Sequence, residues 1–278
     1  MSRHPLCKEE LLLDYSKYWF WKQPAKNPLS QELLKVPLDP SQVLPLSDIN
    51  RLLEPGYQER EQGWCVLPDG TGYHADYIWM PNVTVDMIDW WYVWHFCAPS
   101  SVPEGHGNLR YKIWCPQEHV DTGFDDEASR ARALDESIPM RERRYTAKNF
   151  IHESIDGGDT DNVLFLHAEC FDPEEFGFDP IKLRDPASGT LVTARTPTLH
   201  QIQIYQFRPY GKHDVEMRVR VYSGYDFVDG KFVKVPNYQT TPEEQMGGSQ
   251  HILCEYPNLA RFLPQLYAEE SFKPIDAY

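Results

Sequence analysis

Apolar and polar residues alternate along the second half of the chain, and this alternation restricts the fold more than any other feature. Apolar side chains occupy every second position of residues 202–204 and 215–221, which is the period of a strand with one buried face. The alternation therefore predicts consecutive antiparallel strands in one sheet. Weaker signals of the same kind predict further strands at Tyr111–Trp114, Tyr145–Glu153, Asn162–Glu169 and Thr190–Thr193.

Two helices are predicted beside this sheet. One begins after Thr84, whose side chain can cap it, and is apolar almost all round as far as Phe96, so it should be buried. The other closes the chain at about Gly248–Glu269, where Pro257 and Pro264 predict a kink or a break. Strands followed by one long helix favour an α+β fold in which a curved sheet wraps around the helix and encloses a cavity.

The first part of the chain differs from the rest in its residue composition. Prolines recur through residues 24–55 and permit only short helices between irregular links. Helices are predicted at Lys8–Trp21 and Ser47–Leu53. We therefore divide the chain into a small helical N-terminal region, residues 1–74, and a larger domain, residues 75–278.

Charge and cysteine content exclude several classes of protein. The chain carries 27 basic and 42 acidic residues, a net charge of −15, which argues against partners such as nucleic acids or anionic membranes. The cysteines are scattered without a CxxC pair, so a zinc ribbon or a thioredoxin-type motif is not expected. Neither a secretory signal nor an apolar run long enough for a membrane helix is recognised. These features predict a soluble, cytoplasmic protein with free thiols.

The histidines and carboxylates are the remaining candidates for chemistry, because no GxGxxG, P-loop or GxSxG motif occurs. His251 and Glu255 are four residues apart, so on a helix they project from one face and can hold one metal ion. An ordinary polar pair is the commoner meaning of this spacing. Two imidazoles and two carboxylates with an open position would suit a catalytic zinc, but spacing alone does not assemble such a set.

Three segments resemble the 2,4-diacetylphloroglucinol hydrolase family, which includes the phloretin hydrolases and fungal relatives. They are Arg110–His119, Phe150–Gly158 and His251–Glu270, the last containing HILCEY and NLARFLPQLYAEE. The resemblance implies a small helical N-terminal part and a START-like helix-grip domain that holds zinc. It also implies an enzyme that hydrolyses the carbon–carbon bond between an acyl group and a polyhydroxylated, phloroglucinol-type ring. The expected partner is therefore a small acylphenol substrate.

The resemblance also implies roles for particular residues. Tyr111 matches a tyrosine that hydrogen-bonds the phenolic substrate, and a second such tyrosine corresponds to Tyr222 or Tyr225. Thr122 stands where the family's prototype has an asparagine, so the preferred pattern of ring hydroxyls should differ. The positions that match the zinc ligands are His119, Glu153, His251 and Glu255.

Several alternatives stay open at this stage. His200, at a strand position just before Gln201, is either a proton donor that points into the cavity or an ordinary strand histidine. An isomerase or cyclase of polyketide metabolism could use the same pocket, and a START-like domain could bind an aromatic ligand without catalysis. The oligomeric state is also open, with a homodimer as one option.

Overall fold

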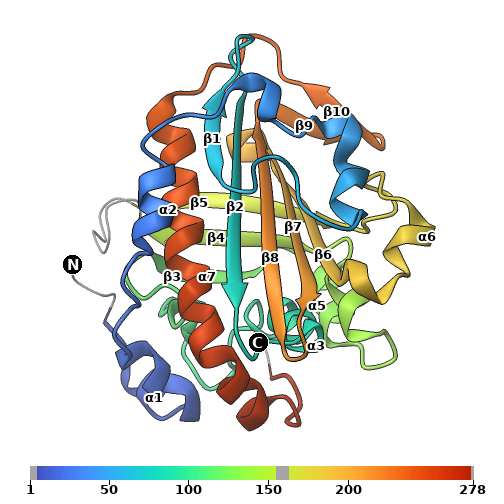
Figure 1. The fold of residues 1–278 in the computed structure, drawn as a ribbon. Coiled ribbons are helices and arrows are strands. Elements are labelled where there is room, and N and C mark those ends of the chain that lie inside the picture. The colour runs from blue at the N-terminus through green and yellow to red at the C-terminus, as the bar shows by residue number, and fades with distance from the viewer. Residues whose placement is uncertain (1–4, 155–162, 277–278) are drawn as a thin grey trace.

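A curved antiparallel sheet wraps around one long C-terminal helix in the computed structural model, which describes residues 5–154 and 163–276 (Figure 1). The strand order is β1-β2-β8-β7-β6-β5-β4-β3, and each neighbouring pair is antiparallel. This arrangement confirms the predicted α+β fold. The strands of the large sheet are β1 (Gly63–Val66), β2 (Gly72–Met80), β3 (His119–Phe124), β4 (Lys148–Ser154), β5 (Val163–Phe171), β6 (Thr190–Thr196), β7 (Gln201–Tyr210) and β8 (Asp214–Ser223).

The C-terminal helix α7 (Pro242–Glu270) lies along the concave side of the sheet, against β1 and β2 (Figure 1). It begins earlier than predicted, because Thr241 and Glu244 form a capping box and Pro242 occupies the first turn. Of the two predicted effects of the prolines, a kink or a break, the break is wrong, since the helix continues through both of them. Its buried apolar side chains, with Leu259 and Phe262 fully buried, stabilise the helix where each proline removes a hydrogen bond.

Helix α3 (Val85–Trp94) supports the same core from the other side. The Thr84 hydroxyl accepts a hydrogen bond from the amide of Met87, as the sequence predicted, and the helix ends at Trp94 rather than at Phe96. Its aromatic residues are buried against α7 and the inner face of the sheet. Aromatic rings of this size bury a large apolar area, so α3 fixes the inner wall of the domain.

The predicted strand at Tyr111–Trp114 is wrong. These residues belong to a short helix, α4 (Leu109–Lys112), and the turn after it, and the Asn108 side chain caps the helix by accepting from the amide of Arg110. Aromatic and β-branched residues favour strands locally, but one helical turn buries both Tyr111 and Trp114 in the main core. Tertiary packing therefore overrides the local preference.

Strand β8 is buried on both faces, although its alternation predicted one exposed face. Arg218 and Arg220 are fully buried, and Glu61 lies 2.7 Å and 2.5 Å from their guanidinium nitrogens. Burial alone would raise the pKa of Glu61, but the two arginines hold it at about 2. The segment that contains Glu61 covers this outer face, together with a second hydrophobic cluster around Ile49 and Tyr222. The N-terminal region therefore closes the back of the sheet.

The predicted boundary at residue 74 falls inside β2, so the large sheet takes strands from both of the predicted regions. Strands β1 and β2 were not predicted, because most of their residues on both faces are buried and the alternation is therefore lost. The predicted helix at Lys8–Trp21 is divided into α1 (Lys8–Leu11) and a 3-10 helix at Asp14–Phe20. Asn162 and the end of the segment Phe150–Gly158 lie outside the described residues.

The remaining elements are short. A two-stranded sheet is formed by β9 (Tyr225–Val228) and β10 (Lys231–Lys234). The other helices are α2 (Pro28–Leu33), α5 (Glu127–Leu134) and α6 (Pro180–Leu183), with 3-10 turns at Pro40–Gln42, Leu46–Leu53, Met140–Arg144, Pro186–Ser188 and Pro197–Leu199.

Within residues 5–154 and 163–276, no helix combines the length and apolarity that crossing a membrane requires. All six cysteines are free thiols, as predicted.

Candidate metal centre and cavity

A cavity of about 900 Å³ lies between α7, α3 and the inner face of strands β4 to β7. This volume is within the range of small-molecule sites in proteins, about 300–1,000 Å³. Its wall combines apolar side chains such as Leu166, Val192 and Ile252 with several tyrosines. Glu153, His251 and Glu255 also line it, so the cavity brings titratable groups and an apolar binding surface together.

His119 begins β3 and is completely buried beside this cavity. Its Nδ1 lies 3.2 Å from the carbonyl oxygen of Tyr111, and the two rings stack with centroids 3.8 Å apart. Donation from Nδ1–H to that carbonyl leaves the lone pair on Nε2, which is buried and has no hydrogen-bond partner among the described residues. Burial keeps the pKa of His119 well below its usual range, so the imidazole is a neutral donor of that lone pair.

Glu153 faces His119 because the two residues pair directly between β3 and β4. Glu153 Oε1 lies 3.7 Å from Nε2 of His119, and the hydroxyl of Tyr111 donates a hydrogen bond to the same carboxylate. A register shift just after His119 in β3 bends the strand locally. The pairing thus places an imidazole and a carboxylate from different strands at one point.

Helix α7 supplies the other two groups from consecutive turns. His251 Nε2 lies 3.8 Å from Oε2 of Glu153 and 3.7 Å from Oε2 of Glu255. The same oxygen of Glu255 lies 3.3 Å from Nε2 of His119. His251 Nδ1 in turn bonds to the carboxylate of Glu118, an outer partner that fixes the ring and directs Nε2 toward the other three groups.

The pKa values show a concentration of negative charge around these imidazoles. Burial raises the pKa of Glu255 well above its usual range, and the neighbouring Glu153 and Glu118 raise it further. Burial alone would lower the pKa of His251, but Glu255, Glu153 and Glu118 outweigh it and raise that pKa well above its ordinary value. Burial, followed by Glu153 and Glu255, also raises the pKa of Tyr111. A cation between these groups would relieve the repulsion.

The group formed by His119, Glu153 and His251 can bind a metal, since its donor atoms all lie within 4.8 Å of one another. Glu255 adds a second carboxylate next to both imidazoles. The fit is supported by Nε2 of His119, which has no hydrogen-bond partner among residues 5–154 and 163–276. It is also supported by the outer hydrogen bonds of both imidazoles, which are typical of metal-ligating histidines. The structure therefore brings together the four residues that the family resemblance implied.

Metal binding at this group should release protons, so its affinity should fall as the pH falls. Without an ion, the raised pKa values of His251 and Glu255 favour their protonated forms, and a cation must displace those protons. Calorimetric titration of metal-free protein with a divalent cation, in two buffers with different ionisation enthalpies, would count the protons released. Affinity that is unchanged between neutral and mildly acidic pH would contradict binding at these residues.

His200 lies at the cavity, as one of the alternatives expected. It ends the 3-10 turn at Pro197–Leu199 in a left-handed conformation, with φ 52° and ψ 50°, rather than occupying a strand position. Its side chain lines the cavity, and Nδ1 is buried with no hydrogen-bond partner within the described part of the chain. A role as proton donor stays a prediction.

Three of the residues proposed to bind substrate lie elsewhere. Tyr222 points into the cluster on the outer face of the sheet, where its hydroxyl donates to the carbonyl of Leu44. Tyr225 packs against the same outer cluster. The hydroxyl of Thr122 is buried and donates to the carbonyl of Phe150. None of the three lines the cavity, since Tyr222 and Tyr225 lie at the outer cluster and the Thr122 hydroxyl is used within the sheet.

The structure adds functional candidates that sequence reasoning missed. Tyr92 and Tyr256 line the cavity and share a hydrogen bond between their hydroxyls, and Tyr205 lines it from β7. Glu118 orients His251. Glu118 and Tyr256 are chain neighbours of His119 and Glu255, which was an available signal for both. Nothing in the sequence distinguished Tyr92 and Tyr205 from ordinary core residues.

Fold and site together define a helix-grip protein with an internal cavity and a group of side chains that can bind a metal. The chain belongs to the DAPG hydrolase PhiG domain family, whose model matches residues 44–268. The predicted family is therefore confirmed, and the match includes part of the segment that covers the outer face of the sheet.

Relatives at the sequence level are hydrolases by name. Phloretin hydrolase from Eubacterium ramulus is 29% identical over 275 residues, which cover 95% of this chain and 93% of the relative. The 2,4-diacetylphloroglucinol hydrolase from a Pseudomonas species is 26% identical over 243 residues, covering 81% and 76%. The enzyme of that name from Pseudomonas protegens is also 26% identical, covering 81% and 73%.

Solved structures with a similar shape are much more distant. Norcoclaurine synthase from Thalictrum flavum has 10% identity and a TM-score of 0.36, covering 73% of this chain and 90% of that one. A protein of unknown function from Staphylococcus aureus has 7% identity and the same TM-score, covering 72% and 98%. Likeness at this level supports no conclusion about the function of the chain.

Proposed function

We propose that this protein is a zinc-dependent hydrolase that cleaves the carbon–carbon bond between an acyl group and a phloroglucinol-type ring. The observation that carries the proposal is the convergence of His119, Glu153, His251 and Glu255 beside a cavity lined by tyrosines. Membership of the DAPG hydrolase PhiG domain family and the names of the relatives support this reaction.

Zinc is the metal proposed, because neutral imidazoles and carboxylates are donors that it accepts in catalytic sites. His119, Glu153, His251 and Glu255 would hold it. When bound, zinc would lower the pKa of a water molecule toward neutrality and polarise a carbonyl oxygen. Glu118 would keep Nε2 of His251 directed at the ion, and the carbonyl of Tyr111 would do the same for His119.

The reaction must avoid an aryl carbanion as leaving group. A phloroglucinol ring allows this by tautomerising: protonation of the ring carbon that bears the acyl group converts the compound into a β-diketone. Attack of water on the acyl carbonyl and collapse then break the carbon–carbon bond and release a stabilised enolate. The products are a carboxylic acid and the deacylated phenol. The chain must therefore provide a proton donor near the ring carbon and a dry surface for the ring.

Particular residues are suited to these tasks. Tyr111 donates to Glu153 and lines the cavity, so its hydroxyl is close to both the metal ligands and the substrate space. His200 is the second candidate proton donor, since its Nδ1 is buried without a partner among the described residues. Leu166, Val192 and Ile252 offer the apolar surface against which the ring would pack.

The reaction is tested with a matched pair of aryl ketones. Purified protein loaded with zinc should convert an acylphloroglucinol into the free acid and the phenol, with solvent deuterium entering at the former acyl-bearing carbon. Acetophenone should not react, because its ring has no route to a β-diketone.

Each other outcome identifies a different function. Comparable turnover of acetophenone would overturn the tautomer mechanism, and a rearranged ring without free acid would indicate an isomerase or cyclase. Binding without any chemical change of the acylphloroglucinol would indicate a carrier of aromatic ligands.

A further inference from the structure

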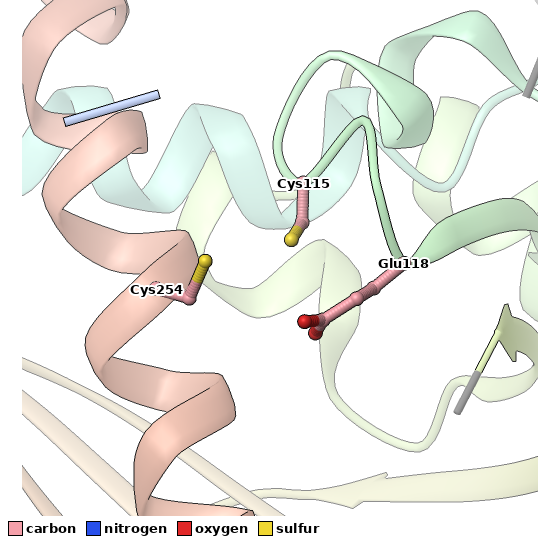
Figure 2. A group of neighbouring side chains, drawn as sticks. All are labelled: Cys115, Glu118 and Cys254. Atoms are coloured by element: carbon pink, nitrogen blue, oxygen red, sulfur yellow. The ribbon is translucent and has the colours of Figure 1, made fainter. Parts of the chain in front are cut away.

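A second group of potential metal ligands lies next to the first and uses sulfur. Cys115, Glu118 and Cys254 place their donor atoms within 4.8 Å of one another. Figure 2 shows Cys115 and Glu118 on the turn that precedes β3 and Cys254 on α7, with the two sulfur atoms directed into the space between these elements. Glu118 lines the cavity but neither cysteine does, so the two sulfur atoms lie outside the proposed substrate space.

The turn that carries two of these side chains has an ordered backbone before any ion binds. The carbonyl oxygen of Cys115 accepts hydrogen bonds from the amides of Glu118 and His119, at 3.0 Å and 2.8 Å. Cys115 and Glu118 are thereby fixed on one side of a tight turn, opposite the face of α7 that carries Cys254 (Figure 2). With the backbone ordered in this way, only side-chain rotations remain to be restricted when a ligand binds.

The cysteines of this group differ from two other buried cysteines of the chain. The thiols of Cys65 and Cys97 donate to the backbone carbonyls of Val66 and Val93, as small core residues do. The thiol of Cys115 instead interacts with Cys254 and Glu118, the other two members of its group. Its side chain is buried, whereas Cys254 and Glu118 are partly exposed, which leaves an approach for an ion and for water.

We propose that Cys115, Glu118 and Cys254 form a second metal site, for a thiophilic divalent cation such as Zn²⁺ with water as the fourth ligand. Tetrahedral zinc with Zn–S bonds of about 2.3 Å needs its sulfurs roughly 3.8 Å apart, so side-chain rotations suffice to close this group around an ion. Each thiol gives up its proton to solvent on binding. Lys26 is near enough to act electrostatically on both Glu118 and Cys254, and it offsets the excess negative charge of two thiolates and a carboxylate.

The ion bound by Cys115, Glu118 and Cys254 would position the ligands of the first site. It links α7, between His251 and Glu255, to the turn that leads into His119, and Glu118 is shared because its carboxylate also accepts from His251 Nδ1. The elements that carry three of the four candidate ligands of the first site are thus joined at one point. The sulfur site therefore fixes the distance between α7 and β3.

Cobalt(II) distinguishes the two sites, because only cysteine thiolates give an intense sulfur-to-cobalt charge-transfer absorption. Metal-free protein, kept reduced, is titrated with Co²⁺ while absorption and bound metal are measured. We expect two cobalt ions per chain, one of them giving the sulfur absorption. The Cys115→Ser, Cys254→Ser variant should bind one ion without it, and the matched control Cys65→Ser, Cys97→Ser should behave as the wild type.

Two further variants distinguish loss of one metal site from loss of the other. Glu153→Gln, Glu255→Gln should lose the ion without sulfur absorption and keep the other, so failure of the first site is distinguished from failure of the second. Glu118→Gln retains both thiols and replaces the serine variant if that one does not fold. Loss of an outer partner alone costs about 10–100-fold in metal affinity, so loss of this ligand should weaken the sulfur-bound ion at least about tenfold. The affinity is read from the sulfur absorption alone, because Glu118 also orients His251 in the first site. Absence of the sulfur absorption in wild-type protein, its persistence in Cys115→Ser, Cys254→Ser, or a Cys115–Cys254 disulfide in the reduced preparation would overturn the proposal.

Discussion

Replacing both His251 and Glu255 by alanine should remove the metal of the cavity site and reduce acyl hydrolysis by more than about a hundredfold. Loss of an outer partner alone costs roughly 10–100-fold in metal affinity or activity, and this variant removes two of the four proposed ligands. Alanine has the highest helix propensity, so α7 should still form. Metal analysis of the protein as purified and kcat/KM with an acylphloroglucinol measure the two effects.

His152→Ala is the matched control. His152 precedes Glu153 in β4, but its ring packs on Phe165, with centroids 4.3 Å apart, and it does not line the cavity. Activity and cavity-site metal content should therefore equal those of the wild type. If the His251→Ala, Glu255→Ala protein keeps its metal in the sulfur-free site, these two residues are not ligands, and the proposed centre is wrong.

Tyr111→Phe should slow hydrolysis roughly tenfold to hundredfold. The hydroxyl of Tyr111 donates to the carboxylate of Glu153, and a hydrogen bond to a charged group is worth about 1.5–3 kcal/mol, which corresponds to that range of rates. Phenylalanine keeps the ring that stacks on His119, so folding should change less than turnover. Steady-state kinetics and thermal unfolding of the same preparation compare the two.

Measuring the metal affinity of Tyr111→Phe shows whether Tyr111 affects the rate through the metal site or through the substrate. A loss of metal affinity equal to the loss in rate would mean that Tyr111 acts by holding Glu153, whereas an unchanged affinity with a lower kcat would mean contact with the substrate. Tyr222→Phe is the control, since its hydroxyl bonds to Leu44 on the outer face. It should cost about 1–2 kcal/mol of stability and leave kcat/KM unchanged. Equal kinetics of Tyr111→Phe and wild type would remove Tyr111 from the mechanism.

Local sequence patterns correctly predicted those helices and strands whose buried faces match their own apolar periodicity. Strands β7 and β8 followed from alternation, and α3 followed from the Thr84 cap and its apolar surface. The spacing of His251 and Glu255 on a helix was also sufficient to place both side chains on one face. These features depend on neighbours within one or two turns or on a period of two, so a single sequence contains them.

Long-range packing decided the rest. The meeting of His119, Glu153 and α7 depends on the register between β3 and β4 and on how the sheet curves around the helix, which no short segment encodes. The family resemblance offered Tyr222 or Tyr225 as a second substrate-binding tyrosine, but the N-terminal region covers β8 and makes its outer face a second core that contains Tyr222. Residues 111–114 form a helical turn because burial in the main core outweighs their strand preference. The sequence by itself determined β7, β8, α3 and the placement of His251 and Glu255 on one helix face. The tertiary structure determined which side chains meet, because those contacts join segments far apart in the chain.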